Sequence, residues 1–328
     1  MNRTCFALSL LLAASVAAMP AVARPVKGAW TAVADDDRPD RLQFSMHTAR
    51  HDQNGSTFAI GDFTGLTAAQ VGATTSSDVT FELRREAGTI AFDGTFRNGD
   101  GAGQFAFTPD PGYATALKKL GVAFDADGDA DRTQFQITLF DVSTAFIRSM
   151  QELGYHESLD TYQQFRIFGV DPAYVHDMAA VGFDHLGAEK LVETRIHGAT
   201  PDYIRSMRKS GRDLSLDDYI RARIFAITPE FEAEMAKAGY ANLEHDRLVE
   251  FKIHGVTPAF VAELRSLGYT HVSAQHLVDM RIHGVTPDFI RRVEKAGYHH
   301  VPVDKLVEMR IFDIEPEMVK ALDDADKK

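Results

Sequence analysis

The sequence contains a single cysteine among 328 residues, and this residue, Cys5, lies in the first apolar stretch of the chain. The rest of the chain therefore has no disulfide, no thiol nucleophile and no cysteine-ligated metal. Its stability has to come from the size of the apolar core, and about 300 residues are enough for two domains.

Long apolar runs are lacking as well. The stretch from Phe6 to Val16 is too short to span a membrane. It follows the basic Arg3 and precedes Ala21-Val22-Ala23, which is the pattern of a cleaved secretory signal. We therefore predict a signal peptide over residues 1–23, cleavage near Ala23, no membrane span in the mature chain, and a periplasmic or secreted location in a bacterium.

Positive charge is also scarce, with 35 Lys and Arg against 47 Asp and Glu and a net charge of −12. Such a balance disfavours nucleic acid and anionic lipid as partners. The sequence also contains no His-Glu-x-x-His, no Gly-x-Ser-x-Gly, no phosphate-binding glycine loop and no dinucleotide fingerprint. We expect a protein or cell-envelope component as the partner, and no catalytic residue.

Residues 24–109 consist of short runs in which apolar and polar residues alternate, such as Leu42-x-Phe44-x-Met46 and Val79-x-Phe81-x-Leu83. Turn sequences separate these runs. This pattern predicts a small antiparallel β-meander, folded over so that Trp30 and the phenylalanines lie inside. One short helix is expected near residues 67–71.

From residue 110 the chain repeats one phrase every 28 or 29 residues, and the best copies, residues 254–258 and 283–287, read His-Gly-Val-Thr-Pro. A period of this length is typical of stacked helical repeats. The last position of the phrase, which we call the proline slot, is occupied by Thr144, Pro172, Pro201, Pro229, Pro258, Pro287 and Pro316.

Each repeat is predicted to hold two short helices. The first helix begins at the proline slot after a Thr or Asp cap and ends at a glycine ten residues later. The second helix carries apolar residues ten, nine and five positions before the next slot, and we expect all three to be packed in the core.

The predicted fold class is thus α+β, with a small N-terminal antiparallel β domain followed by an all-α solenoid of helix-pair repeats. The predicted boundaries are a signal peptide at 1–23, the β domain at 24–109, tandem repeats at 110–322 and a polar tail at 323–328.

A planar ring recurs four positions before the proline slot, and His197, His254 and His283 occupy it in three repeats. Neighbouring histidines in this register suggest a shared metal. The same position is a phenylalanine in other repeats, however, and phenylalanine is no ligand, so the pattern favours a structural ring at the end of a helix.

A cation recurs six positions before the slot, and we call this series the cation ladder. It can bind an acidic peptide or anionic glycan, or it can stabilise helix C-termini and pair with nearby carboxylates. The ladder consists of Arg166, Arg195, Arg223, Lys252, Arg281 and Arg310.

An acidic loop contains Asp125, Asp127, Asp129 and Asp131 around a glycine. Alternating carboxylates suit Ca²⁺, although the spacing departs from that of an EF-hand and is also that of a solvated loop. Apart from this possible Ca²⁺ site, no cofactor is predicted.

The repeat phrase, the Gly-Tyr pairs such as Gly268-Tyr269 and the Leu-Val-x-x-Arg-Ile-His run resemble tandem repeats of uncharacterised exported bacterial proteins. Similar repeats form the extracytoplasmic tails of some BlaR-type membrane metallopeptidase sensors, and residues 86–103 resemble the β segment that precedes them. The resemblance implies an envelope setting and a sensing or binding role, and it carries over no catalytic residue.

Two functions follow from the sequence. The first is a non-enzymatic exported interaction, scaffold or sensing module that binds through the helical surface. The alternative is an envelope enzyme or enzyme accessory with a site in the β domain around His47 and His51.

Overall fold

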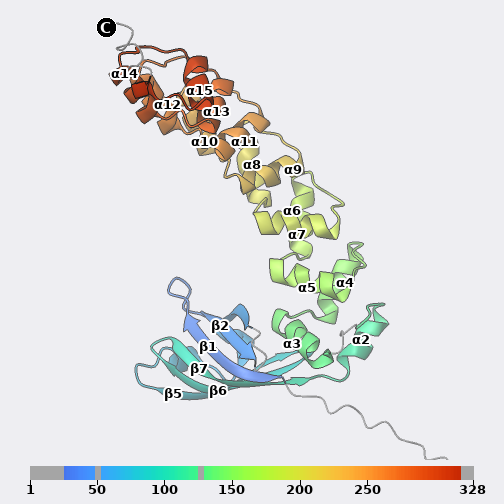
Figure 1. The fold of residues 1–328 in the computed structure, drawn as a ribbon. Helices are drawn as coiled ribbons and strands as arrows, with labels where there is room; N and C mark the ends of the chain where they lie inside the picture. Colours follow the sequence, from blue (N-terminus) through green and yellow to red (C-terminus); the bar gives the residue numbers. More distant parts are fainter. Residues whose placement is uncertain (1–25, 49–52, 125–128, 319–328) are drawn as a thin grey trace, which may run out of the picture. The chain divides into compact units, whose positions relative to one another are not determined.

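The computed structural model describes residues 26–48, 53–124 and 129–318. It confirms the predicted α+β class, because an antiparallel sheet is followed by a long series of helices. The chain divides into two compact units, with the boundary between Arg148 and Ser149. The first unit contains the sheet and the second contains most of the helical repeats (Figure 1).

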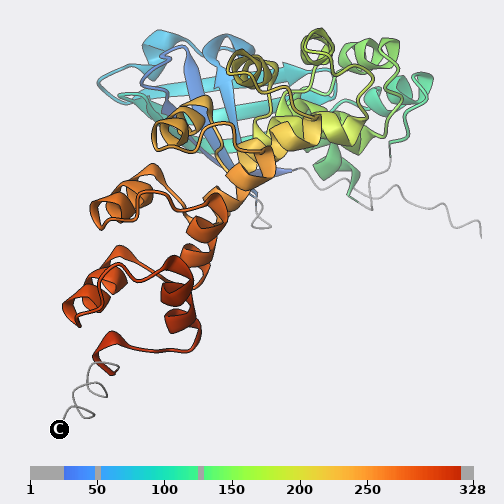
Figure 2. The same ribbon diagram turned by 90° about the horizontal axis from the view of Figure 1, so that it is seen from above.

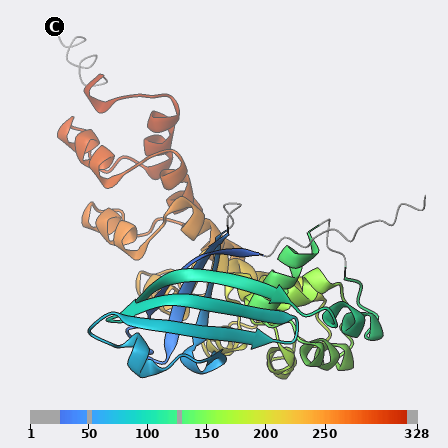
Figure 3. The same ribbon diagram turned by 90° about the horizontal axis from the view of Figure 1, so that it is seen from below.

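The sheet has seven antiparallel strands in the order β3-β2-β1-β7-β6-β5-β4. Two meanders, β1 to β3 and β4 to β7, are therefore joined by pairing of the first strand with the last, and the sheet curls (Figure 3). The predicted short helix is present as α1 (Ala68–Val71), capped by the Thr67 side chain. The strands are β1 (Lys27–Ala34), β2 (Arg41–Thr48), β3 (Gln53–Ala59), β4 (Phe63–Thr64), β5 (Ser77–Arg85), β6 (Gly88–Arg97) and β7 (Asp100–Pro109), with the 3₁₀ turn η1 (Ile60–Asp62) before β4.

Aromatic rings fill the inner face of the curled sheet, as the alternating pattern predicts. Trp30 contacts the rings of Phe44 and Phe96, each with a centroid separation of 5.5 Å. Its indole N–H donates hydrogen bonds to the carbonyls of Asp93 and Gln104, so the polar edge of the ring is satisfied inside the core.

Two helices, α2 (Tyr113–Lys119) and α3 (Ala130–Phe140), belong to the same unit as the sheet. Phe135 and Leu139 of α3 are part of the core of the sheet, and the Phe135 ring stacks on Phe105 at 5.5 Å. The buried amide of Gln134 donates to the carbonyls of Ala87 and Asp110. Helix α3 is therefore anchored by both apolar packing and hydrogen bonds.

The first repeat departs from proline at its slot, and the structure gives a reason. Thr144 begins α4 (Thr144–Glu152) and donates its backbone N–H and its hydroxyl to the carboxylate of Glu86, at 2.7 and 2.6 Å. A proline has neither donor. The β5–β6 turn thus holds the start of the first repeat.

The following helices alternate between the two predicted kinds, and each is nine or ten residues long. First helices are α4, α6 (Pro172–Ala180), α8 (Pro201–Lys209), α10 (Pro229–Lys237), α12 (Pro258–Ser266) and α14 (Pro287–Lys295). Second helices are α5 (Leu159–Phe168), α7 (Ala188–His197), α9 (Leu216–Ile224), α11 (His245–His254), α13 (Ala274–Ile282) and α15 (Val303–Ile311).

The predicted helix ends are confirmed. Side chains of Asp171, Thr200, Thr228, Thr257 and Thr286 accept the backbone N–H two residues beyond the proline and cap the first helices. Ser158, Ser215 and Ser273 cap second helices in the same way. These caps follow directly from the sequence because they need only local hydrogen bonds.

Within the second unit, repeats are joined mainly through their second helices. Every successive pair of second helices is in contact, whereas among the described first helices only α12 and α14 are in contact to a similar extent. In Figure 2 the segment coloured orange to red shows the two rows of helices. In a curved array the more closely spaced row lies on the inner side of the curve.

A hydrogen bond also recurs between repeats. The tyrosine of the Gly-Tyr pair donates its hydroxyl to the carbonyl just before the next second helix, as Tyr240 does to Val272 and Tyr269 does to Val301. Where arginine replaces tyrosine, the Arg212 guanidinium donates to the equivalent carbonyl of Leu243.

Candidate interaction surface

The cations of the ladder lie on the second helices and are engaged inside the array. Arg195 of α7 lies 3.8 Å from the centroid of the Tyr174 ring on α6 and donates a hydrogen bond to the Gly169 carbonyl at the end of α5. One side chain thus joins three consecutive helices.

The arrangement recurs along the ladder. Arg281 lies 5.1 Å from the Phe260 centroid and donates to the His254 carbonyl at 3.0 Å. Lys252 lies 3.7 Å from the Phe231 centroid, and its burial lowers the pKa of its ammonium group. Arg223 and Arg310 lie over the rings of Tyr203 and Phe289.

These contacts support the structural interpretation of the ladder, because cation–π contacts and helix C-termini already occupy the positive charges. Arg166 holds the same register on α5. Binding of an anionic ligand by the ladder remains a prediction.

The surface that sequence reasoning missed is a row of isoleucines, one per second helix, five positions before the proline slot. They were expected in the core, but 43–54% of each residue is exposed. The isoleucine row consists of Ile167, Ile196, Ile224, Ile253, Ile282 and Ile311.

Helix geometry explains the error. At about 100° per residue, the position five before the slot lies about 140° around the helix from the position ten before it. In α11 the packed face is made by Leu248, Val249 and Phe251, and Ile253 lies beside that face. The position of Phe251, seven before the slot, is the core position that was overlooked.

A sequence signal for the row does exist. The position is isoleucine in all six second helices, while the core positions change among leucine, valine, isoleucine, tyrosine, phenylalanine, methionine and smaller residues. Core positions tolerate such changes when neighbours compensate. At a half-exposed position, core packing does not require isoleucine. Its presence in all six second helices is therefore the signal in the sequence.

The isoleucines have two kinds of neighbour on the exposed side of the second helices. Rings follow them at the next position, among them Phe168 and Phe312, which are 38% and 71% exposed. Carboxylates lie one and two turns earlier, and the side chains of Asp217, Asp246 and Asp304 are 72–78% exposed. The exposed side thus combines an apolar row with carboxylates.

The acidic loop is described only in part. Asp125 and Asp127 lie outside the described residues. Asp129 caps α3 by accepting the Arg132 N–H, and Asp131 lies in the first turn of that helix. Within the described ranges, no three His, Cys, Asp or Glu side chains form a group that can hold a metal ion.

The alternative site in the β domain rests on His47 and His51. His47 lies on β2 with its side chain exposed, whereas His51 lies outside the described residues. The structure therefore describes only one of the two histidines on which this alternative rests.

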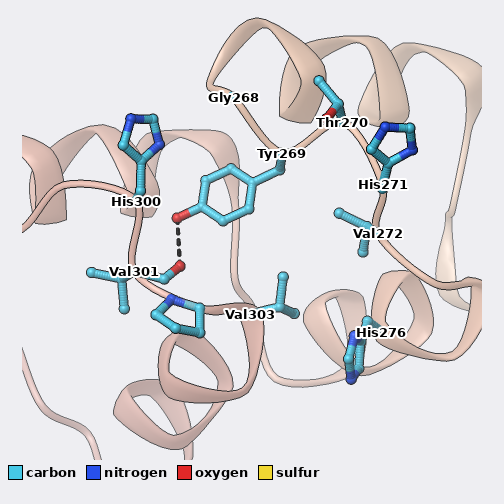
Figure 4. Close-up of a pocket in the computed structure, with 10 residues that line it drawn as sticks. Gly268, Tyr269, Thr270, His271, Val272, His276, His300, Val301 and Val303 are labelled. Carbon is cyan, nitrogen blue, oxygen red and sulfur yellow. Dashed lines mark hydrogen bonds between the residues drawn. The ribbon is translucent and has the colours of Figure 1, made fainter.

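A shallow depression lies between the last two described Gly-Tyr loops and is lined by His271, His276 and His300 (Figure 4). The three imidazoles point in different directions, and His276 lies 3.1 Å from a carboxylate oxygen of Asp304. Tyr269 crosses the floor to donate to the Val301 carbonyl at 2.7 Å. The depression is thus a by-product of the inter-repeat bond, without converging ligands.

One histidine is buried. His245, at the start of α11, is 9% exposed, and neither ring nitrogen has a hydrogen-bond partner among the described residues. Burial lowers the pKa of its imidazole, and Asp218 opposes this shift. The neutral form is the one that the fold accommodates.

The described part of the chain contains no helix long and apolar enough to cross a membrane. Compared with models of protein families, with curated proteins and with solved structures, the chain matches none of them.

Proposed function

We propose that the chain is a non-enzymatic exported interaction module that binds a protein or envelope component through the exposed side of its second helices. The single observation that supports this proposal is the isoleucine row. Six half-exposed isoleucines recur in one register on successive second helices, and exposed apolar surface on a soluble protein marks a binding site where it is extensive.

The energetic scale is adequate for binding. Completing the burial of a half-exposed isoleucine contributes about 1 kcal/mol, so six of them supply roughly 6 kcal/mol before the costs of association. The cation ladder contributes rigidity, since each of its cations with a described contact joins neighbouring helices. A rigid, preorganised surface loses less entropy on binding.

Backbone hydrogen exchange of the intact chain, with and without an extract of the bacterial envelope, tests the proposal. We expect new protection in α7, α9, α11 and α13, and none in β1 to β3. Protection confined to the sheet would instead support the alternative, a site in the β domain. The full chain without extract supplies the baseline for every helix.

A further inference from the structure

We infer that the partner of the isoleucine row is a cationic amphipathic helix whose apolar residues recur about every seven residues. This inference rests on the proposed function and specifies the chemistry of its partner. Four observations of the second unit support it: curvature, spacing, backbone chemistry and charge.

The curvature favours a slender partner. Second helices form the more closely spaced row and therefore lie on the inner side of the curve. Their buried sides pack in the core, and the isoleucine row lies beside that packed side, on the exposed part of this inner row of helices. Two hollow surfaces cannot meet face to face, which disfavours a second copy of the chain at this face.

The spacing of the row matches a helix. Packed helices lie about 8–10 Å apart, so successive isoleucines are separated by about that distance. In a partner helix, seven residues rise about 10.5 Å and return to nearly the same face. In a strand, residues on one face are about 6.6 Å apart, and alternate ones about 13 Å apart.

The hydrogen-bonding needs of the backbone favour a helical partner over an extended segment whose side chains have the same spacing as the isoleucine row. A polyproline-type segment repeats every three residues, about 9.3 Å, but its backbone N–H and C=O groups form no hydrogen bonds within the segment and have to bond water or side chains of the protein. The six second helices contain no asparagine, and their glutamines are limited to Gln163, Gln164 and Gln275. A helix satisfies its own backbone and needs only the apolar row.

The charges on the second helices indicate which residues should lie beside the apolar stripe of the partner helix. The carboxylates of Asp217 and Asp246 are 75% and 78% exposed, while their cationic partners Lys190 and Arg221 are 35% and 44% exposed. At these two positions the carboxylate therefore reaches further into solvent than the cation that pairs with it, whereas on α15 Lys305 is more exposed than its partner Glu308. A partner with Lys or Arg beside its apolar stripe is complementary to this surface, and the net charge of −12 would speed its approach.

The test uses a fluorescent designed peptide of about 28 residues, long enough to cross four repeats, with leucines in a heptad pattern and lysines on the flanks. Anisotropy with the full chain should show saturable binding. The variant I196S/I224S/I253S should bind at least tenfold more weakly. V33S is the matched control, because Val33 is an apolar residue of equal exposure on β1, and it should bind normally.

Three further peptides separate the alternatives. The same composition with scrambled leucines, a version with glutamate in place of lysine, and a proline-rich version with leucine at every third residue should all bind at least tenfold more weakly. The variant D217N/D246N should bind the lysine peptide severalfold more weakly than the natural chain does. The difference in affinity between the lysine and glutamate peptides should also become smaller. Circular dichroism verifies that each variant is folded.

Equal binding of the scrambled or proline-rich peptide would overturn the inference, as would normal binding by the folded triple variant. Self-association of the chain that disappears in the triple variant would assign the row to a second copy instead. If no peptide binds but envelope extract still protects the second helices, only the partner class is wrong. If extract protects none of them, the proposed function fails as well.

Discussion

At the scale of single residues, the position that ends each second helix is informative because one repeat has alanine there in place of glycine. The position three before the proline slot is glycine in most repeats, and Gly169, Gly198, Gly255 and Gly284 have φ between 68° and 73°. Ala226 takes the same conformation, with φ of 52°. An alanine is strained there because its Cβ crowds the backbone in the left-handed region.

Replacing Ala226 with glycine should therefore stabilise the chain by about 0.5–1 kcal/mol, since relief of strain exceeds the added entropy of the unfolded chain. Urea unfolding followed by circular dichroism measures the change. Ala233→Gly is the control, because Ala233 lies in the interior of α10, where glycine should destabilise by about 1 kcal/mol. A loss of stability in both variants would mean that Ala226 is not strained.

The burial of His245 predicts that the free energy of unfolding depends on pH. Its folded pKa lies below the value of about 6.5 for an unfolded histidine, so the unfolded chain takes up a proton first as the pH falls. Its contribution to the free energy of unfolding is complete above pH about 6.5 and declines as the pH drops through 6.5 towards the lowered folded pKa. His245→Phe should remove this contribution, so its free energy of unfolding should fall less between pH 7.5 and 5.5. An equal fall in both proteins would refute the assignment.

At the scale of elements, the sequence predicted what local chemistry determines. Pro172 and Asp171 placed the start of α6 because a cap needs only its own turn, and Trp30 was correctly placed inside the sheet. The prediction that Ile253 lies in the core was wrong, because the environment of this residue depends on how far the helix is rotated against its neighbours. The bond of Arg212 to Leu243, 31 residues away, likewise depends on stacking and has no local signal.

The hydrogen bonds between repeats predict a measurable contribution to the free energy of unfolding. Tyr269→Phe removes the donor to the Val301 carbonyl and should lower the free energy of unfolding by about 0.5–1.5 kcal/mol. Tyr240→Phe should have a similar effect through Val272, and the double variant should lose about the sum, because the two bonds join different pairs of repeats. Urea unfolding of the three variants decides this, and no loss in either single variant would show that the bonds are dispensable.

A buried and a half-exposed position of the repeats predict losses of stability of different size when aspartate is introduced. Leu264 of α12 is 1% exposed, so Leu264→Asp buries a carboxylate and should destabilise by more than about 4 kcal/mol. Ile253 is 54% exposed, so Ile253→Asp should cost only about 1–2 kcal/mol. Comparing their urea midpoints with that of the natural chain tests whether the isoleucine row lies outside the core. Equal losses would place Ile253 in the core.

At the scale of the whole molecule, the two units gain stability in different ways. The sheet brings together residues distant in sequence, such as Trp30 with Gln104, whereas the principal contacts among second helices join neighbours along the chain. An array of the second kind gains stability step by step as repeats are added, and its ends can be removed one repeat at a time. In such an array each second helix keeps an exposed side, on which its isoleucine lies.

The most direct test of this account is the far-ultraviolet circular dichroism of the chain shortened at residue 286, which removes α14 and α15. The account predicts that the remaining residues keep their helical signal per residue and unfold at a lower urea concentration than the full chain. Loss of the helical signal throughout the shortened chain would contradict it. The helices would then form a closed bundle with long-range contacts, and the exposed row on which the proposed function depends would not exist.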